Sequence, residues 1–135
     1  MQYWILKTEP KTYSFEDLLS EKSTSWDGIR NYQARNNLRS MRVGDECLIY
    51  HSVGPKEIVG LASVSKEAYP DPTSSEQAWI AVDINAIKSL TKHIKLAALK
   101  IHPKLQNMSL VKQGRLSVCP INQTEFDAIM QLSEN

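Results

Sequence analysis

Short runs of alternating or clustered apolar residues occur along most of the chain, and they predict five or six strands. The clearest run is Trp79 to Ile87, in which Ile80, Val82 and Ile84 share one face, because successive strand residues point to opposite sides of a sheet. Shorter apolar runs predict further strands. These lie at Tyr3–Leu6, Cys47–His51, Ile58–Val64 and Leu116–Ile121.

Helical spacing is found in three other places. Three apolar residues at i, i+4 and i+7 predict a helix from Asn31 to Met41. Ser14 and Asp17 have the spacing of a capping box and predict the start of a short helix. A last helix is predicted to begin near Asn122 or Thr124. It would bury Phe126, Ile129 and Met130.

Together these elements predict an α+β fold. No β-α-β alternation is present, which argues against a parallel sheet. A small, mostly antiparallel, partly closed β-barrel of five to six strands with short flanking helices fits best. We expect one domain over residues 1–135. Residues 20–25 and 69–73 read as loops, residues 94–101 are ambiguous, and Gly60 indicates a bulge or a close backbone approach.

Composition narrows the class of protein. The chain is 41% hydrophobic and 23% charged, which is ordinary for a globular protein. It has neither an apolar run long enough to cross a bilayer nor a signal-peptide pattern at its N-terminus. We therefore expect no membrane association and a place in the cytoplasm, or in the nucleus of a eukaryote. Cys47 and Cys119 are isolated from each other in the sequence and are expected to be buried free thiols.

Basic residues are unevenly distributed although the net charge is only +1. Four arginines and no acid lie between Asp27 and Asp45, and residues 84–124 also lack Asp and Glu while containing seven Lys or Arg. These segments could form a basic face for a phosphate backbone. The fold could equally intermix them with acids from elsewhere, and charge alone does not decide between the two.

Most catalytic and cofactor chemistries lack a matching motif. There is no Gly-rich phosphate loop, no C-x-x-C and no H-E-x-x-H, and three widely spaced histidines do not suggest a metal site. We expect no metal and no cofactor. Glu9 follows an apolar strand and could be a buried carboxylate. A lone carboxylate there is more often a cap or an acceptor than a general base.

The segment from Trp26 to Arg39 holds the densest group of unusual residues. A tryptophan is followed by several amides and arginines at an expected helix start. An aromatic face can stack on a base while amides read its polar edge, and such stacking contributes ~1–3 kcal/mol per base. The alternative is that Trp26 is a core residue and the amides are caps. The polar surroundings favour a pocket.

Seven segments in this order resemble the EVE domain family over nearly the whole chain. They are Tyr3–Pro10, Trp26–Asn36, Val43–Asp45, Tyr50–Ser52, Ile58–Ala62, Ala68–Thr73 and Arg115–Val118. EVE domains are similar to the PUA-like superfamily, which includes the YTH readers of methylated adenine. The resemblance implies a small β-barrel with flanking helices and a pocket for a modified base.

The resemblance also implies roles for individual residues. Trp26 would be the stacking wall, Asn31 would read the base edge, and Lys7, Thr8 and Glu9 would form the floor. His51 and Ser52 would close one side, and Tyr69 and Asp71 would form a wall or lid. Phosphate contacts would come from Arg30, Arg35, Arg39 and Arg115, although Arg39 also reads as a solvated helix residue.

We therefore expect a binding domain for a modified base, either a modified cytosine in DNA or a modified base in RNA. The sequence leaves the oligomeric state open, with a monomer favoured. The protein is not expected to be an enzyme. Two alternatives stay open. An enzyme acting on a nucleobase or an amide would need Glu9 or Asp71 as its general base. A protein or peptide adaptor would instead present an exposed apolar patch.

Overall fold

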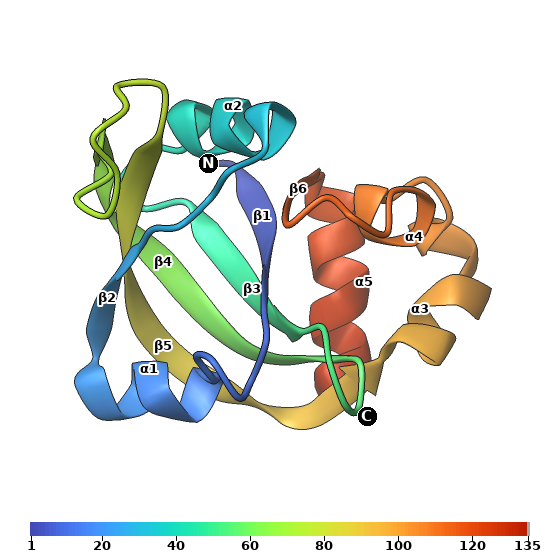
Figure 1. Ribbon diagram of the computed structural model, residues 1–135. Coiled ribbons are helices and arrows are strands. Elements are labelled where there is room, and N and C mark those ends of the chain that lie inside the picture. The colour runs from blue at the N-terminus through green and yellow to red at the C-terminus, as the bar shows by residue number, and fades with distance from the viewer. Residues whose placement is uncertain (135) are drawn as a thin grey trace.

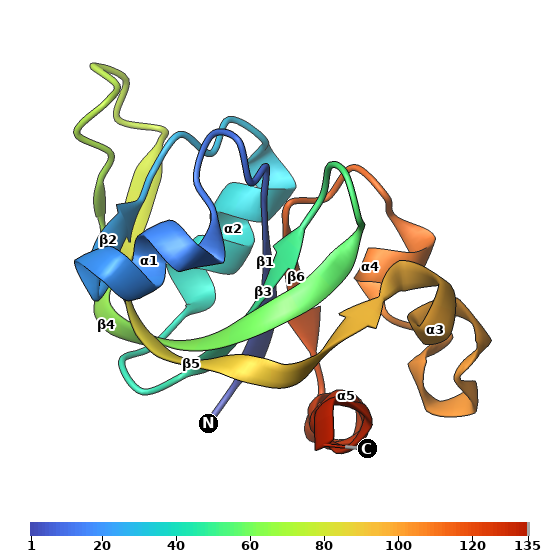
Figure 2. The same cartoon turned by 90° about the horizontal axis from the view of Figure 1, so that it is seen from below.

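A six-stranded mixed sheet forms the body of the molecule in the computed structural model, which describes residues 1–134. Its strand order is β2-β5-β4-β3-β1-β6. Figures 1 and 2 show that β4 and β5 are long and strongly curved, so that the sheet wraps around a concave side. The strands are β1 (Tyr3–Thr8), β2 (Ser23–Trp26), β3 (Glu46–His51), β4 (Glu57–Pro70), β5 (Ile80–Lys95) and β6 (Val118–Ile121).

Most neighbouring strands pair antiparallel, as predicted, but β1 and β3 pair parallel. The chain returns to β3 through two helices and β2, a crossover that the sequence pattern did not reveal. The ladder has β2 and β6 as its two edges within the described residues. These pairings establish an α+β fold with a curved mixed sheet, and closure into a barrel stays a prediction.

Two helices lie on the concave side of the sheet, and the others pack against β5 or follow it. Helices α1 (Phe15–Glu21) and α2 (Tyr32–Ser40) lie on the concave side, between β2 and β1 in Figure 2. The C-terminal helix α5 (Gln123–Glu134) packs against β5. Two short helices, α3 (Leu96–Ile101) and α4 (Ser109–Lys112), and the 3₁₀ turn Pro103–Leu105 connect β5 to β6. No helix in residues 1–134 has the length and apolarity to cross a membrane.

Several local predictions are confirmed. Ser14 and Asp17 form the capping box of α1, and Asn31 is the N-cap of α2. The two cysteines are free and buried. Trp4 and Trp79 are both buried, and the Trp4 indole N–H donates to the Asp45 carboxylate. The caps and the buried positions follow from local sequence because they depend on periodicity or on residues a few positions apart, whereas the Trp4–Asp45 bond joins residues 41 positions apart.

Three loop or ambiguous segments differ from the prediction. Residues 20–25 were expected to form a loop, but Ser23–Trp26 is strand β2, paired antiparallel with β5. An edge strand pairs with only one neighbour and can therefore be polar. The polar residues of β2 gave no apolar pattern that would predict a strand. Strand β4 continues to Pro70 in the segment predicted as a loop. The ambiguous residues 94–101 contain the end of β5 followed by α3.

Candidate base-binding cavity

A cavity of about 370 Å³ lies between the end of β1 and the edge strand β2. This volume is within the ~300–1,000 Å³ typical of small-molecule sites. Strand β1, the β1–α1 loop, β2 and the loop before α2 all contribute to its wall. The lining residues are Lys7, Thr8, Thr12, Tyr13, Thr24, Ser25, Trp26, Asp27 and Ile29.

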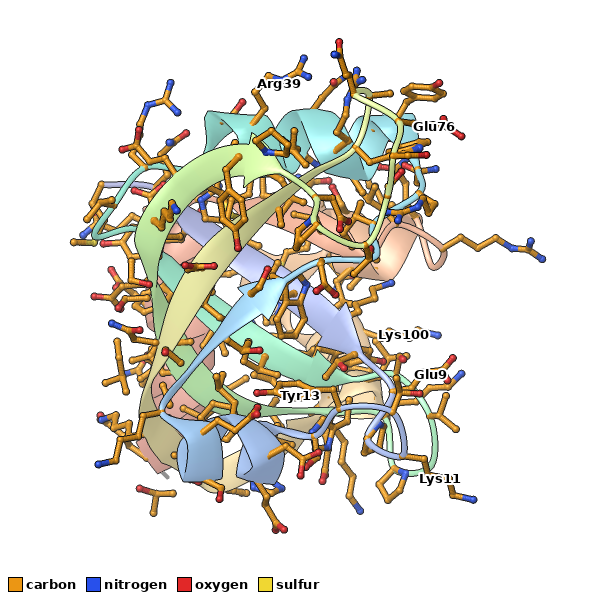
Figure 3. The ribbon with its side chains drawn as sticks, turned by 60° about the vertical axis from the view of Figure 1, so that its left-hand side comes forward. Glu9, Lys11, Tyr13, Arg39, Glu76 and Lys100 are labelled. Atoms are coloured by element: carbon orange, nitrogen blue, oxygen red, sulfur yellow. The ribbon has the colours of Figure 1, made fainter. Side chains whose placement is uncertain are left out.

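Two aromatic side chains dominate the apolar part of this cavity. Tyr13 and Trp26 meet edge to face, with ring centroids 6.3 Å apart and ring planes at 82°. Only 7% of Trp26 is exposed, so the surrounding chain fixes its ring. Tyr13 hydrogen-bonds to the Glu21 carboxylate, and burial together with this bond raises the pKa of Tyr13 to about 12. Figure 3 shows Tyr13 above α1 and near β2.

Backbone and side-chain contacts hold Tyr13 in place. The Thr8 hydroxyl donates to the Tyr13 carbonyl oxygen over 2.6 Å, and Ser14 begins α1 one residue later. The first turn of α1 is held further by His51, whose Nε2 accepts from the Phe15 N–H over 3.1 Å. Burial lowers the pKa of His51, in keeping with a neutral ring that accepts this bond.

Asp71 fixes the loop that follows Trp26. Its side chain is fully buried and accepts from the Gly28 N–H over 2.8 Å and from Arg30 Nη1 over 2.9 Å. The other carboxylate oxygen accepts from the Thr73 N–H and hydroxyl over 2.7 and 2.6 Å. Burial alone would raise the pKa of Asp71, but these hydrogen bonds outweigh it and hold the pKa well below its usual value. Asp71 therefore positions the cavity wall as a permanent anion.

Lys7 lies where the cavity meets a second groove of about 220 Å³. Its Nζ donates to the Gly114 carbonyl oxygen over 2.8 Å and lies 5.9 Å from the centre of the Tyr50 ring. Burial lowers the pKa of Lys7, and the nearby Lys56 lowers it further. Ser52 also lines this second groove.

The structure thus brings together only part of the predicted site. Trp26, Lys7 and Thr8 line the main cavity, as predicted from the resemblance. Asn31 and Arg115 instead line a neighbouring hollow of about 260 Å³, where the Asn31 side-chain oxygen caps α2 by accepting from the Ala34 N–H. Which of these residues contact a ligand stays a prediction.

Four further predicted residues line neither the cavity nor the two neighbouring hollows. Glu9 is exposed (Figure 3), not a buried carboxylate, because its carbonyl rather than its side chain holds the turn after β1. His51 holds α1, and Asp71 is buried behind the wall, so neither forms a side or a lid. Tyr69 lies across β5, where its hydroxyl bonds Asp83 and Ser25.

None of the four predicted phosphate ligands lines the cavity: Arg115 lines the neighbouring hollow, and the other three lie elsewhere. Arg30 is paired with Asp71 and also donates to Thr73. Arg35 donates to the Ala78 carbonyl oxygen and stacks over Tyr32. Arg39 projects from the opposite end of the molecule to Tyr13 (Figure 3). The arginines of this basic segment therefore lie on several surfaces of the molecule.

Tyr13, Thr24 and Asp27 line the cavity but were missed from the sequence. Asp27 is exposed as a whole residue, but its carboxyl is partly buried. This partial burial is the largest cause that raises the pKa of Asp27, and the nearby Asp71 is the second. Tyr13 stands just before the capping residue Ser14, and Thr24 alternates with Trp26. Those two spacings are the only signals that could have indicated them.

The family model of the EVE domain matches residues 2–132. The chain belongs to the EVE domain family. Human thymocyte nuclear protein 1 is 37% identical over an alignment covering 98% of this chain and 74% of the human protein.

Solved structures agree with this assignment. The crystal structure of human THYN1 protein in complex with 5-methylcytosine-containing DNA matches with a TM-score of 0.93 at 37% identity, covering 100% of this chain and 99% of that one. A protein from Agrobacterium tumefaciens matches with a TM-score of 0.96 at 38% identity, covering 98% and 93% of the two chains. The EVE fold of this protein is therefore shared across distant organisms.

Proposed function

We propose that this EVE protein binds a modified base in DNA, with a modified cytosine inserted between β1 and β2. The observation that carries the proposal is the Trp26–Tyr13 cavity, open to solvent yet lined by fixed aromatic rings. Support also comes from human THYN1 protein, which shares the fold at 37% identity and is described in complex with 5-methylcytosine-containing DNA.

The cavity offers both surfaces that base recognition needs. Stacking on an aromatic ring contributes ~1–3 kcal/mol per base. The Thr8 hydroxyl donates its hydrogen bond to the Tyr13 carbonyl oxygen, so it faces a ligand as an acceptor. Lys7 donates one bond to Gly114 and keeps further N–H donors. A base entering from a duplex must be flipped out at a cost of a few kcal/mol, which contacts of this kind offset.

Binding without catalysis is the second part of the proposal. Glu9 and Asp71 were the two possible general bases. Glu9 is exposed outside the cavity lining, and Asp71 is buried with a pKa held low by its donors, which makes it a poor proton acceptor. Asp27 is the one carboxylate among the described lining residues, and no histidine or cysteine accompanies it there.

Fluorescence anisotropy with matched duplexes tests this proposal. The duplexes differ only in one central base: cytosine, 5-methylcytosine, 5-hydroxymethylcytosine or thymine. We expect tighter binding of one modified cytosine, and Trp26→Ala should weaken that binding by about 5- to 150-fold, the equivalent of the lost stacking. An RNA series with the same modifications shows whether the preference extends to RNA.

Tyr32→Ala is the matched control, because Tyr32 is an exposed aromatic on α2 outside the cavity lining. It should bind as the wild type does. Thermal unfolding must show that both variants are folded. Equal affinity for all four duplexes, or a Trp26→Ala variant that keeps the full preference, would contradict base recognition in this cavity.

A further inference from the structure

Three lysines converge on the groove next to the base cavity. Lys7, Lys56 and Lys100 line this groove, together with the buried Tyr50 and the α3–α4 region. Lys7 also lines the base cavity, so the two hollows meet at its side chain. A ligand that fills the cavity would therefore place its neighbouring groups at this groove.

The charge of this groove is not neutralised by the protein. No carboxylate is among its lining residues, and within residues 1–134 none of the three lysines forms an ion pair. Burial lowers the pKa of Lys7 and outweighs the opposite effect of Cys119, and Lys56 lowers the pKa further, so the positive charge of Lys7 is held at a cost. A bound anion would relieve that cost, because an opposite charge nearby favours the charged form.

Lys7 and the backbone of the groove wall are held in place, whereas the side chains of Lys56 and Lys100 are exposed. Lys7 is held by the Gly114 carbonyl, and the backbone carbonyl of Lys56 accepts from the Leu96 N–H over 2.9 Å, which ties the β3–β4 turn to α3. Leu96, Leu110 and Val111 form an apolar floor. Two further donors of Lys7 remain free for an anion. Such preorganised donors bind an anion without further ordering of the chain.

We infer that the Lys7–Lys56–Lys100 groove receives the phosphate next to the flipped nucleotide. This inference rests on the proposed function. It places the phosphate contact at the lysines and not at the arginines expected from the sequence, because Arg30, Arg35 and Arg39 have other partners or lie elsewhere and Arg115 lines a different hollow. The cavity supplies selectivity for the base, and the lysine groove fixes the strand. Lys7 joins the two and makes the flanking phosphate part of the same site.

The salt dependence of DNA binding tests this assignment. Each lost phosphate contact should reduce the slope of log affinity against log salt by about 1. The test variant is Lys56→Gln/Lys100→Gln, which leaves the half-buried Lys7 intact. The matched control is Lys88→Gln/Lys92→Gln, with the same change of charge at exposed positions of β5 outside this groove. We expect a smaller slope in the test variant than in the control, with an unchanged preference for the modified base.

Free ligands provide an independent readout. In a thermal-shift assay the 3′- or 5′-monophosphate of the bound nucleoside should stabilise the wild type more than the nucleoside does. The test variant should lose that difference and keep the response to the nucleoside. Wild-type selectivity with test and control variants that behave alike would overturn the phosphate assignment alone. Absence of any modified-base preference in the wild type would overturn the proposed function and this inference with it.

Discussion

Asp71 positions a binding surface that it does not line. Its two carboxylate oxygens hold Gly28 and Arg30 on one side and Thr73 on the other. The loop between Trp26 and α2 is thereby tied to the segment after β4. Hydrogen bonds to a buried charge are stronger than neutral ones, so one residue can fix a loop that otherwise has no ladder partner.

Asp71→Asn should destabilise the protein by about 1–3 kcal/mol at pH 7. The NH₂ group of the new amide would face the N–H groups of Gly28 or Arg30, and two donors cannot bond each other. The folded-state pKa of Asp71 is lowered, so its stabilisation is complete above the unfolded value of ~3.9 and is lost as pH falls below it. The difference in unfolding free energy between wild type and variant should therefore shrink from pH 7 to pH 3. Urea titrations at both values measure it, and an equal difference at both would contradict this role.

The same dependence on tertiary partners limits prediction at single residues. Trp26, Lys7 and Thr8 could be placed at the cavity from the resemblance, and they lie at the ends of β2 and β1. Asp71 and Arg30 were predicted to contact the ligand. In the structure they bond each other, 41 positions apart in the chain. No local pattern shows such a pair, and Tyr13 was missed for the same reason.

At the scale of elements, α1 packs on β4 through a position that only glycine can fill. A Cβ built on Gly60 would lie 2.3–2.5 Å from the Phe15 ring. Real Cβ atoms do not approach their neighbours so closely. Phe15 is buried, with only 3% of it exposed. The sequence predicted a bulge or a close backbone approach at Gly60. The structure has both: the β4–β5 register shifts between Ile58 and Gly60, and the ring of Phe15, the first residue of α1, approaches the backbone.

Gly60→Ala should therefore destabilise the fold by about 1–3 kcal/mol through overpacking. Because Phe15 follows the cavity residue Tyr13 by two positions, the variant should also weaken base binding. The double variant Gly60→Ala/Phe15→Leu should recover part of the loss, since two residues in contact are not additive. Chemical denaturation measures the three stabilities. A single variant as stable as the wild type would show that the ring shifts freely.

Whole elements were predicted correctly where apolar residues recur with the period of a helix or a strand. Helix α2, β1, β3 and the C-terminal helix α5 lie where apolar spacing placed them. Strand β2 was missed because it is short, polar and held by β5, and the parallel β1–β3 pair was missed with it. The cavity wall is built from that strand, so local periodicity could give most of the fold but not the shape of the site.

For the molecule as a whole, the affinity for a duplex is the energy of the cavity contacts minus the cost of extracting the base. That cost is a few kcal/mol in a paired duplex and smaller at a mismatch. The cavity contacts do not change with the partner base, because the flipped base leaves it behind. The proposed function therefore predicts that pairing strength and affinity vary in opposite directions.

The same modified cytosine should bind more tightly opposite adenine or an abasic site than opposite guanine. Each 1.4 kcal/mol of flipping cost removed should strengthen binding about tenfold, while Trp26→Ala should respond much less because it gains little from insertion. Anisotropy titrations at one salt concentration, with an unmodified cytosine in the same three contexts, measure both effects. If the protein recognised the modified base within an intact groove, weakening the pair would leave its affinity unchanged or lower it. Equal affinity in the three contexts would thus exclude base flipping while leaving selectivity itself to be explained by the duplex surface.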